Sequence, residues 1–190
     1  MTSPPRPANR LFVAADLPAD ARALLARSAA EVAAACGGRP VAPESLHVTL
    51  DFIGRVDPLR WPALVEGVTR ALAGPPLRAG LGPLRARPRS SRARLVAREL
   101  IDPEGALAEW ILRVRAAVDA ALERRPDGSR PWPHVTLVRL RRAARVDLPP
   151  PADEEHLFDI SRAALYDSHQ SPGGPSRYRE LIAVELEPAP

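Results

Sequence analysis

The stretch His47-Val48-Thr49-Leu50 is repeated, residue for residue, as His134-Val135-Thr136-Leu137. The two copies contain two of the chain's four histidines. In an extended strand, residues i and i+2 point to the same face, so each copy presents an imidazole beside a hydroxyl. The valine and leucine between and after them point to the opposite face. We therefore expect two strands that bury one face and keep a histidine and a threonine in contact with solvent.

Two such strands facing one cleft can carry out acid–base chemistry on a phosphodiester. An imidazole has an ordinary pKa of about 6.5, so it serves as a base in one protonation state and as an acid in the other. A neutral and a charged histidine on opposite sides of phosphorus can take a proton from water and give one to the leaving oxygen. The hypothesis makes His47 and His134 the acid–base pair, and Thr49 and Thr136 donors to the phosphate oxygens.

Other chemistries find less support in the residues. A catalytic zinc site needs a third protein ligand, and we expect the remaining histidines, His156 and His169, to be exposed. A serine hydrolase elbow of the form Gly-x-Ser-x-Gly is missing, and Cys36 has no motif partner. All 27 basic residues are arginine, which excludes a lysine Schiff base and a lysine-containing phosphate loop.

Composition sets the remaining expectations. The net charge of +4 and the pI of about 10.4 favour polyanionic partners, because guanidinium groups stay charged and match phosphate in a bidentate way. The single cysteine cannot form an internal disulfide, which predicts a reducing, cytoplasmic location. No apolar run reaches the roughly 18 residues of a membrane span. Nothing in the sequence demands more than a monomer.

Hydrophobic periodicity predicts an α+β fold. Residues 1–9 read as a disordered proline-rich leader. The ten expected elements are strands at 11–15, 46–53, 77–84, 93–100, 134–140, 158–166 and 179–186, and helices at 19–35, 59–73 and 104–123. This order indicates helices packed outside antiparallel or mixed sheets, and the repeated motif suggests two related lobes. The basic segment 85–92 reads either as a solvated hairpin tip or as an arm over a nucleic acid backbone.

The segments around the motifs resemble the two-histidine (2H) phosphoesterases, and in particular the bacterial and archaeal RNA 2′,3′-cyclic phosphodiesterases, historically called 2′-5′ RNA ligases. The matching segments are Arg10-Leu11-Phe12-Val13-Ala14, residues 43–54, residues 133–139, and Leu165-Tyr166-Asp167-Ser168 with Gly173-Gly174 and Tyr178. The resemblance implies one bilobal domain over residues 10–190. It also implies two pseudo-symmetric lobes of antiparallel or mixed sheet, with outer helices around a central groove.

The same resemblance implies an activity: hydrolysis of RNA 2′,3′-cyclic phosphate ends to 2′-phosphates, with no metal or cofactor. The substrates are RNA ends or small cyclic nucleotides, and 2′-5′ ligation is a possible further reaction. His47 and His134 carry over as the acid–base pair, with His47 as acid and the swapped roles left open. Thr49 and Thr136 carry over as phosphate contacts. Arg139 either binds phosphate or is an exposed charge at a strand end.

Two aromatic residues complete the expected site. Phe12 and Tyr178 match positions where the family often places aromatic rings near the nucleotide, although core packing explains each equally well. Ser45 departs from the asparagine more usual in the family, and the loop at 167–172 also differs, which puts substrate specificity rather than chemistry in question. The alternative function is an RNA or nucleotide binding protein in which catalysis is incidental or absent.

Overall fold

The computed structural model describes residues 10–126, 128–148, 156–170 and 176–187, and the strands in these ranges form one antiparallel sheet. The sheet order is β7-β4-β5-β6-β3-β1-β8-β9, with β2 paired to β6. The strands are β1 (Arg10–Asp16), β2 (Arg39–Pro40), β3 (His47–Gly54), β4 (Leu77–Arg87), β5 (Ala93–Ile101), β6 (His134–Ala144), β7 (Leu157–Ile160), β8 (Arg162–Gln170) and β9 (Ser176–Glu185). The helices are α1 (Ala19–Cys36), α2 (Trp61–Leu72) and α3 (Ala106–Leu122), with 3₁₀ turns η1 (Pro43–Ser45), η2 (Pro58–Arg60) and η3 (Ser90–Arg92).

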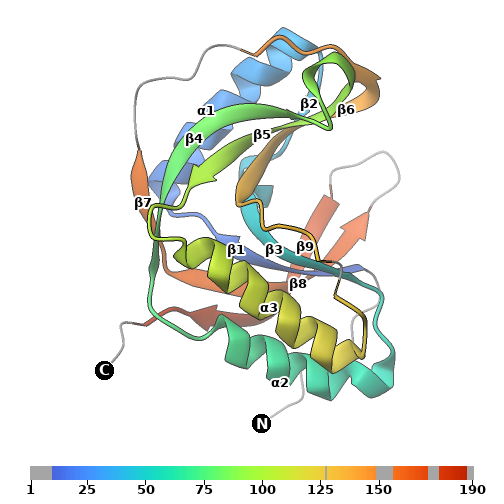
Figure 1. Ribbon diagram of the computed structural model, residues 1–190. Coiled ribbons are helices and arrows are strands. Elements are labelled where there is room, and N and C mark those ends of the chain that lie inside the picture. The colour runs from blue at the N-terminus through green and yellow to red at the C-terminus, as the bar shows by residue number, and fades with distance from the viewer. Residues whose placement is uncertain (1–9, 127, 149–155, 171–175, 188–190) are drawn as a thin grey trace.

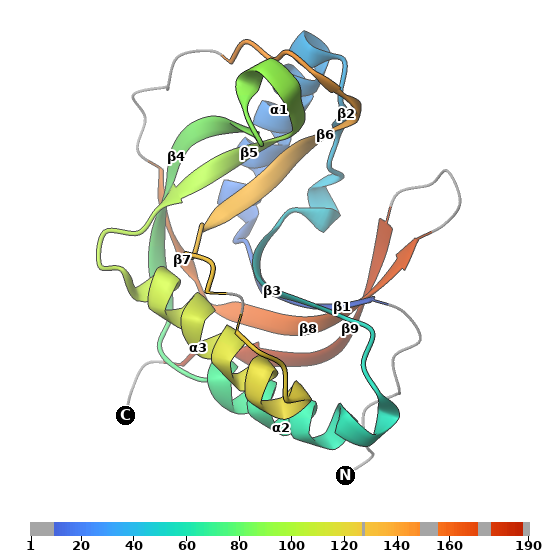
Figure 2. The same cartoon turned by 45° about the vertical axis from the view of Figure 1, so that its right-hand side comes forward.

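The two motif strands, β3 and β6, are neighbours at the centre of the sheet. They pair at Val48 and Val135, and the sheet continues outward through β5, β4 and β7 on one side and through β1, β8 and β9 on the other. Figures 1 and 2 show the two halves curving away from this junction. The predicted α+β fold with two pseudo-symmetric lobes is confirmed. All the pairings are antiparallel, so the sheet is not mixed.

The alternation of the motif strands sets the two faces of the sheet. The valines and leucines of both copies, Val48, Leu50, Val135 and Leu137, are 0% exposed and belong to the hydrophobic core. The histidines and threonines on the other face are partly exposed. Helix α1 packs on β6, and the pair α2 and α3 packs on the β3, β8 and β9 half (Figure 1). The helices therefore cover the apolar face, and the histidines lie on the opposite, concave face.

Helix boundaries follow local signals. Helix α1 ends at Gly37, which adopts the left-handed conformation with φ of 66°. Asp57 accepts a hydrogen bond from the Leu59 N–H and so caps η2, which delays the start of α2 to Trp61. Gly105, with φ of 72°, precedes α3, so the predicted helix at 104–123 begins two residues later than expected. One face of this helix is buried, through Leu107, Trp110, Ile111, Val114 and Val118.

The C-terminal part of the chain differs from expectation. The predicted strand at 158–166 is two strands in different halves of the sheet: β7 pairs with β4, and β8 pairs with β1. Only Ser161 separates them, and its carbonyl accepts a hydrogen bond from the Leu186 N–H. No glycine or proline marks the break, so the apolar run reads as one strand. The basic segment 85–92 completes β4 and then forms η3. The leader at 1–9 lies outside the described residues.

The described chain contains no helix that is long and apolar enough to cross a membrane. The prediction that residues 10–190 form one bilobal domain stays a prediction. The continuous sheet path from β7 to β9 supports it, because the two halves share β-strand pairing at their centre.

Candidate active site

The first motif histidine is oriented by the turn that precedes it. In η1, the N–H groups of Ser45 and Leu46 donate to Ala42 and Pro43, and the turn places the Ser45 carbonyl beside the ring. The Nδ1–H of His47 donates to this carbonyl at 2.8 Å, because a carbonyl oxygen can only accept. Nε2 therefore lacks the proton in the neutral ring, and it lies 3.1 Å from Oγ1 of Thr49. The backbone of Ser45 makes this contact, so serine in place of asparagine leaves it intact.

The second motif histidine is oriented in the same way. Pro131 and Pro133 flank Trp132, and a residue before proline favours an extended conformation. The Nδ1–H of His134 donates to the carbonyl oxygen of Trp132 at 2.6 Å. The two rings also stack, with centroids 3.8 Å apart and an interplanar angle of 17°. In both copies the carbonyl of residue i−2 accepts from Nδ1 and leaves Nε2 without a proton in the neutral ring.

A carboxylate lies across from the first histidine on the neighbouring strand. Asp16 of β1 is the register partner of His47. Its Oδ1 accepts a hydrogen bond from the Tyr166 hydroxyl at 2.6 Å, and Oδ2 pairs with Arg162. These contacts hold the carboxylate in place, and its negative charge favours protonation of the ring.

The second histidine has an equivalent carboxylate. Glu99 of β5 is the register partner of His134. It accepts a hydrogen bond from Nε1 of Trp132 at 2.8 Å and pairs with Arg85 at 2.8 Å. Arg87 completes this side, with its guanidinium carbon 4.1 Å from the centroid of the indole ring. The two halves of the sheet thus repeat the histidine, its backbone acceptor and a carboxylate held by an aromatic donor and an arginine.

The β3–β6 junction brings the two motifs together. From the pair Val48–Val135, antiparallel register sets His47 opposite Thr136 and Thr49 opposite His134. A small cavity of about 20 Å³ is lined by residues of both motifs: His47 and Thr49 of the first, and Thr136 of the second. Val41, Ser45, Arg139 and Tyr178 complete its lining. Thr49 also lines a larger cavity together with His134. Thr49 therefore lines both cavities, and the two cavities together contain all four motif residues.

Burial makes both imidazoles hard to protonate. It is the main cause that lowers the pKa of His47 to about 4, with smaller contributions from the positive charges of Arg139 and His134. Burial also lowers the pKa of His134, again helped by nearby guanidinium groups, including Arg139. The positive charge of Arg139 thus lowers the pKa of both rings and favours their neutral forms.

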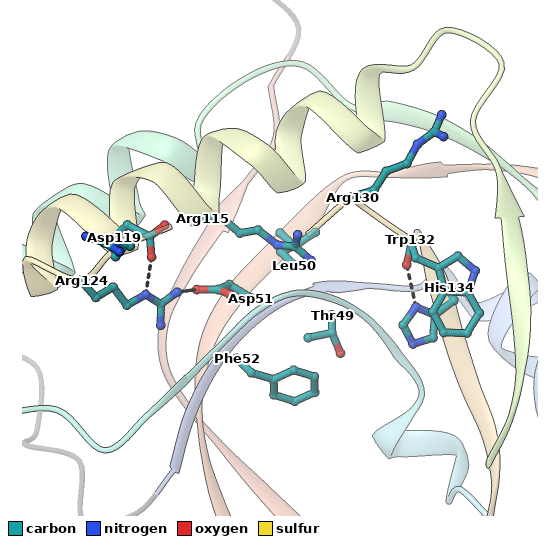
Figure 3. Close-up of a pocket in the computed structure, with 11 residues that line it drawn as sticks. Thr49, Leu50, Asp51, Phe52, Arg115, Asp119, Arg124, Arg130, Trp132 and His134 are labelled. Atoms are coloured by element: carbon teal, nitrogen blue, oxygen red, sulfur yellow. Dashed lines mark hydrogen bonds and ion pairs between the residues drawn. The ribbon is translucent and has the colours of Figure 1, made fainter. Parts of the chain in front are cut away.

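The larger cavity has a volume of about 420 Å³, within the range typical of ligand sites. Figure 3 shows it between β3 and the C-terminal part of α3, with Thr49 and His134 at one end. Its aromatic lining residues are Phe52 and Trp132, and its charged ones are Asp51, Arg115, Asp119, Arg124, Arg125 and Arg130. Phe52 is 68% exposed.

The two aromatic residues expected from sequence, Phe12 and Tyr178, are in contact but differ in their exposure to the groove. Phe12 is 4% exposed, and its ring packs against His47 and Tyr178 with centroid distances of 5.1 and 4.8 Å. This placement favours packing over stacking with a base. Tyr178 lines the small cavity and meets His47 edge to face at 5.4 Å. It therefore stays a candidate for nucleotide contact.

Sequence reasoning missed Phe52 and Trp132. Strict alternation from Thr49 points Phe52 into the core, but the β1–β3 register shifts between Val13 and Ala14 and so changes the alternation. The resulting Phe12–Phe52 pair turns Phe52 toward the groove. A signal for Trp132 was present, because the Pro-Trp-Pro sequence directly precedes the second motif. Across the described ranges, no three His, Cys, Asp or Glu side chains are grouped as metal ligands.

Comparison with known proteins identifies related molecules. The model of the family "LigT like Phosphoesterase" matches residues 16–82. The structure of Escherichia coli LigT complexed with NADP+ is 30% identical, with a TM-score of 0.75, covering 95% of this chain and 99% of that one. LigT complexed with 3′-AMP is 28% identical, with a TM-score of 0.79 and coverages of 95% and 99%. TT0787 of Thermus thermophilus is 28% identical, with a TM-score of 0.79 and coverages of 94% and 98%. No curated protein matches the sequence significantly.

The desolvation of the half-buried His47 makes stability depend on pH. Its pKa is about 4 when folded and about 6.5 when unfolded, so below pH 6.5 the unfolded chain binds the extra proton. The full contribution is present above pH 6.5 and is lost as the pH falls toward 4, at a cost of about 3 kcal/mol. His47→Asn keeps a donor for Ser45 but does not titrate. Urea unfolding from pH 7.5 to 4.5 should show a shallower loss of unfolding free energy in the variant than in the wild type. Equal losses in both proteins would contradict the assigned burial.

Proposed function

Because the chain belongs to the LigT-like phosphoesterase family of the 2H phosphoesterase superfamily, we propose that it opens the 2′,3′-cyclic phosphate at an RNA end and leaves a 2′-phosphate. Family membership by itself is consistent with phosphodiester hydrolysis or ligation. The observation that carries the finer proposal is the meeting of two His-x-Thr units at the β3–β6 junction. Each unit has Nδ1 held by a backbone carbonyl, so two Nε2 atoms are available for proton transfer.

The reaction needs only the groups on this face of the sheet. One Nε2 takes a proton from water as the water oxygen attacks phosphorus, and the bond from phosphorus to O3′ breaks on the opposite side. The other Nε2 gives a proton to O3′, so the product carries a 2′-phosphate and a free 3′-hydroxyl. Thr49, Thr136 and Arg139 donate hydrogen bonds to the non-bridging oxygens, where charge increases in the transition state. The two histidines then exchange protons with solvent.

We assign the base to His47 and the acid to His134, the reverse of the expectation from sequence. A base must be neutral before reaction, and burial holds the pKa of His47 at about 4. Each histidine faces a carboxylate, Glu99 for His134 and Asp16 for His47, but burial lowers the pKa as far as about 4 only for His47. An anionic substrate favours protonation further, so His134 is the ring better suited to carry the acidic proton.

The expected substrate is a nucleotide or an RNA end. The similar structures of E. coli LigT include complexes with 3′-AMP, NADP+ and ATP, which supports a ligand of this class here. The exposed Phe52 and the ring of Trp132 supply π surfaces next to Thr49 and His134, as proteins that bind unpaired bases often do. With a 5′-hydroxyl in place of water, the same steps join RNA ends through a 2′-5′ bond and need no nucleotide triphosphate.

The first test is direct turnover. Purified protein is incubated in excess chelator with an oligoribonucleotide ending in a 2′,3′-cyclic phosphate, and the product end is identified. We expect a 2′-phosphate, and a loss of kcat/KM of about 10²- to 10⁴-fold in His47→Ala and in His134→Ala. His156→Ala, which lies outside both cavities of the site, should keep wild-type activity.

Three results would oppose this function. Turnover that persists unchanged in either motif variant refutes the assigned site. RNA binding without any turnover by the wild type would instead support the alternative of an RNA binding protein. Activity that is lost only on chelation would show that a metal is required.

A sulfur leaving group tests the separate roles of the histidines. A substrate with sulfur at the bridging 3′ position releases a thiolate, which needs little help from an acid. The loss of kcat/KM in His134→Ala, relative to the wild type, should therefore be at least about tenfold smaller on this substrate than on the substrate with oxygen at that position. The loss in His47→Ala should be the same on both substrates. Recovery by His47→Ala alone would restore the assignment expected from sequence, with His47 as the acid.

A further inference from the structure

The larger cavity extends well beyond the reacting centre. One end holds Thr49 and His134, and the other reaches the C-terminal turn of α3 and the segment that follows it. Four arginines line the cavity and only two carboxylates oppose them, so the cavity carries excess positive charge: Arg115, Arg124, Arg125 and Arg130 against Asp51 and Asp119. None of these six residues is needed for the proton transfers described above.

The four arginines are not equivalent. Arg124 is occupied by the protein itself, because it forms ion pairs with Asp51 and Asp119. Arg115 is anchored, since its Nη1 donates to the carbonyl and the hydroxyl of Ser129, both at 3.1 Å. In Figure 3 its side chain runs from α3 toward Leu50, at the floor of the cavity.

The remaining two arginines stay available to a ligand. Arg125 and Arg130 are exposed, and no hydrogen bond or ion pair to another described residue engages either one. Arg130 lies at the rim, on the side of Trp132 (Figure 3). One cation held at the floor and two exposed cations with no partner among the described residues suit a phosphate group, which guanidinium binds through two parallel hydrogen bonds.

We propose that Arg115, Arg125 and Arg130 form a second phosphate subsite, which holds the phosphodiester on the 5′ side of the terminal nucleotide. This inference rests on the proposed function. The reacting phosphate occupies the Thr49 and His134 end, the terminal base lies near Phe52, and the chain continues toward the arginines. The preferred substrate is therefore an oligonucleotide rather than a cyclic mononucleotide.

Substrate length tests this subsite. We compare adenosine 2′,3′-cyclic phosphate bearing a 5′-hydroxyl with a trinucleotide that ends in the same cyclic phosphate. Wild-type kcat/KM should be higher for the trinucleotide and should fall with salt more steeply, since each phosphate contact adds about 0.7 to the slope of log affinity against log salt for a single strand. Arg125→Gln/Arg130→Gln should lower kcat/KM about tenfold for the trinucleotide and change it less than about twofold for the mononucleotide.

Two further variants distinguish a loss of the subsite from a general loss of positive charge. Arg27→Gln/Arg78→Gln removes the same charge from exposed positions outside this cavity and should leave the preference for the trinucleotide intact. Arg115→Gln should reduce the same preference from the cavity floor. An equal loss on both substrates in the Arg125/Arg130 variant, or an equal loss in the control variant, would overturn the proposal.

Equilibrium binding distinguishes this inference from the proposed function. Fluorescence anisotropy with a labelled trinucleotide ending in a 2′-phosphate measures the subsite without turnover. If the wild type hydrolyses neither substrate, the proposed function fails, but about tenfold weaker binding by Arg125→Gln/Arg130→Gln still supports the subsite. Unchanged binding in that variant rejects the subsite, whatever the enzyme activity.

Discussion

The pairing of Val48 with Val135 is the constraint on which the site depends. Each valine lies between the histidine and the threonine of its own motif, so this one contact decides which residues meet on the concave face. A shift of either strand by one residue turns its histidine into the core. The fully buried valines hold the register, because exposing them would lose the burial that stabilises the sheet. The core therefore positions the chemistry.

Outward from this junction, the two halves of the sheet repeat the same support with different side chains. Beside His47 the carboxylate is Asp16, and beside His134 it is Glu99. The repeat extends to the backbone acceptor of Nδ1, which determines the neutral tautomer in both copies. The halves differ in burial and in the rings around each histidine, and these differences give the two imidazoles different tendencies to take a proton.

The two motif strands and the face that each of their side chains occupies could be predicted from the sequence, because they depend on local alternation. The period of two in each motif assigned one face to the core and the other to the groove, and the structure has both faces as predicted. Phe52 could not be placed, because a register shift between β1 and β3 changes the alternation. The division at Ser161 was hidden for a similar reason: the apolar run continues while the partner strand changes. Such features depend on pairing between distant segments.

The proposed reaction requires two imidazoles to act on one phosphorus atom from opposite sides. The most direct measurement is a crystal structure with a nucleoside 2′,3′-cyclic vanadate, whose five-coordinate vanadium imitates the transition state. The account predicts one Nε2 at each apical oxygen, from His47 and from His134, with Thr49 and Thr136 at the equatorial oxygens. Vanadate that contacts a single histidine, or that binds away from the β3–β6 junction, would contradict it.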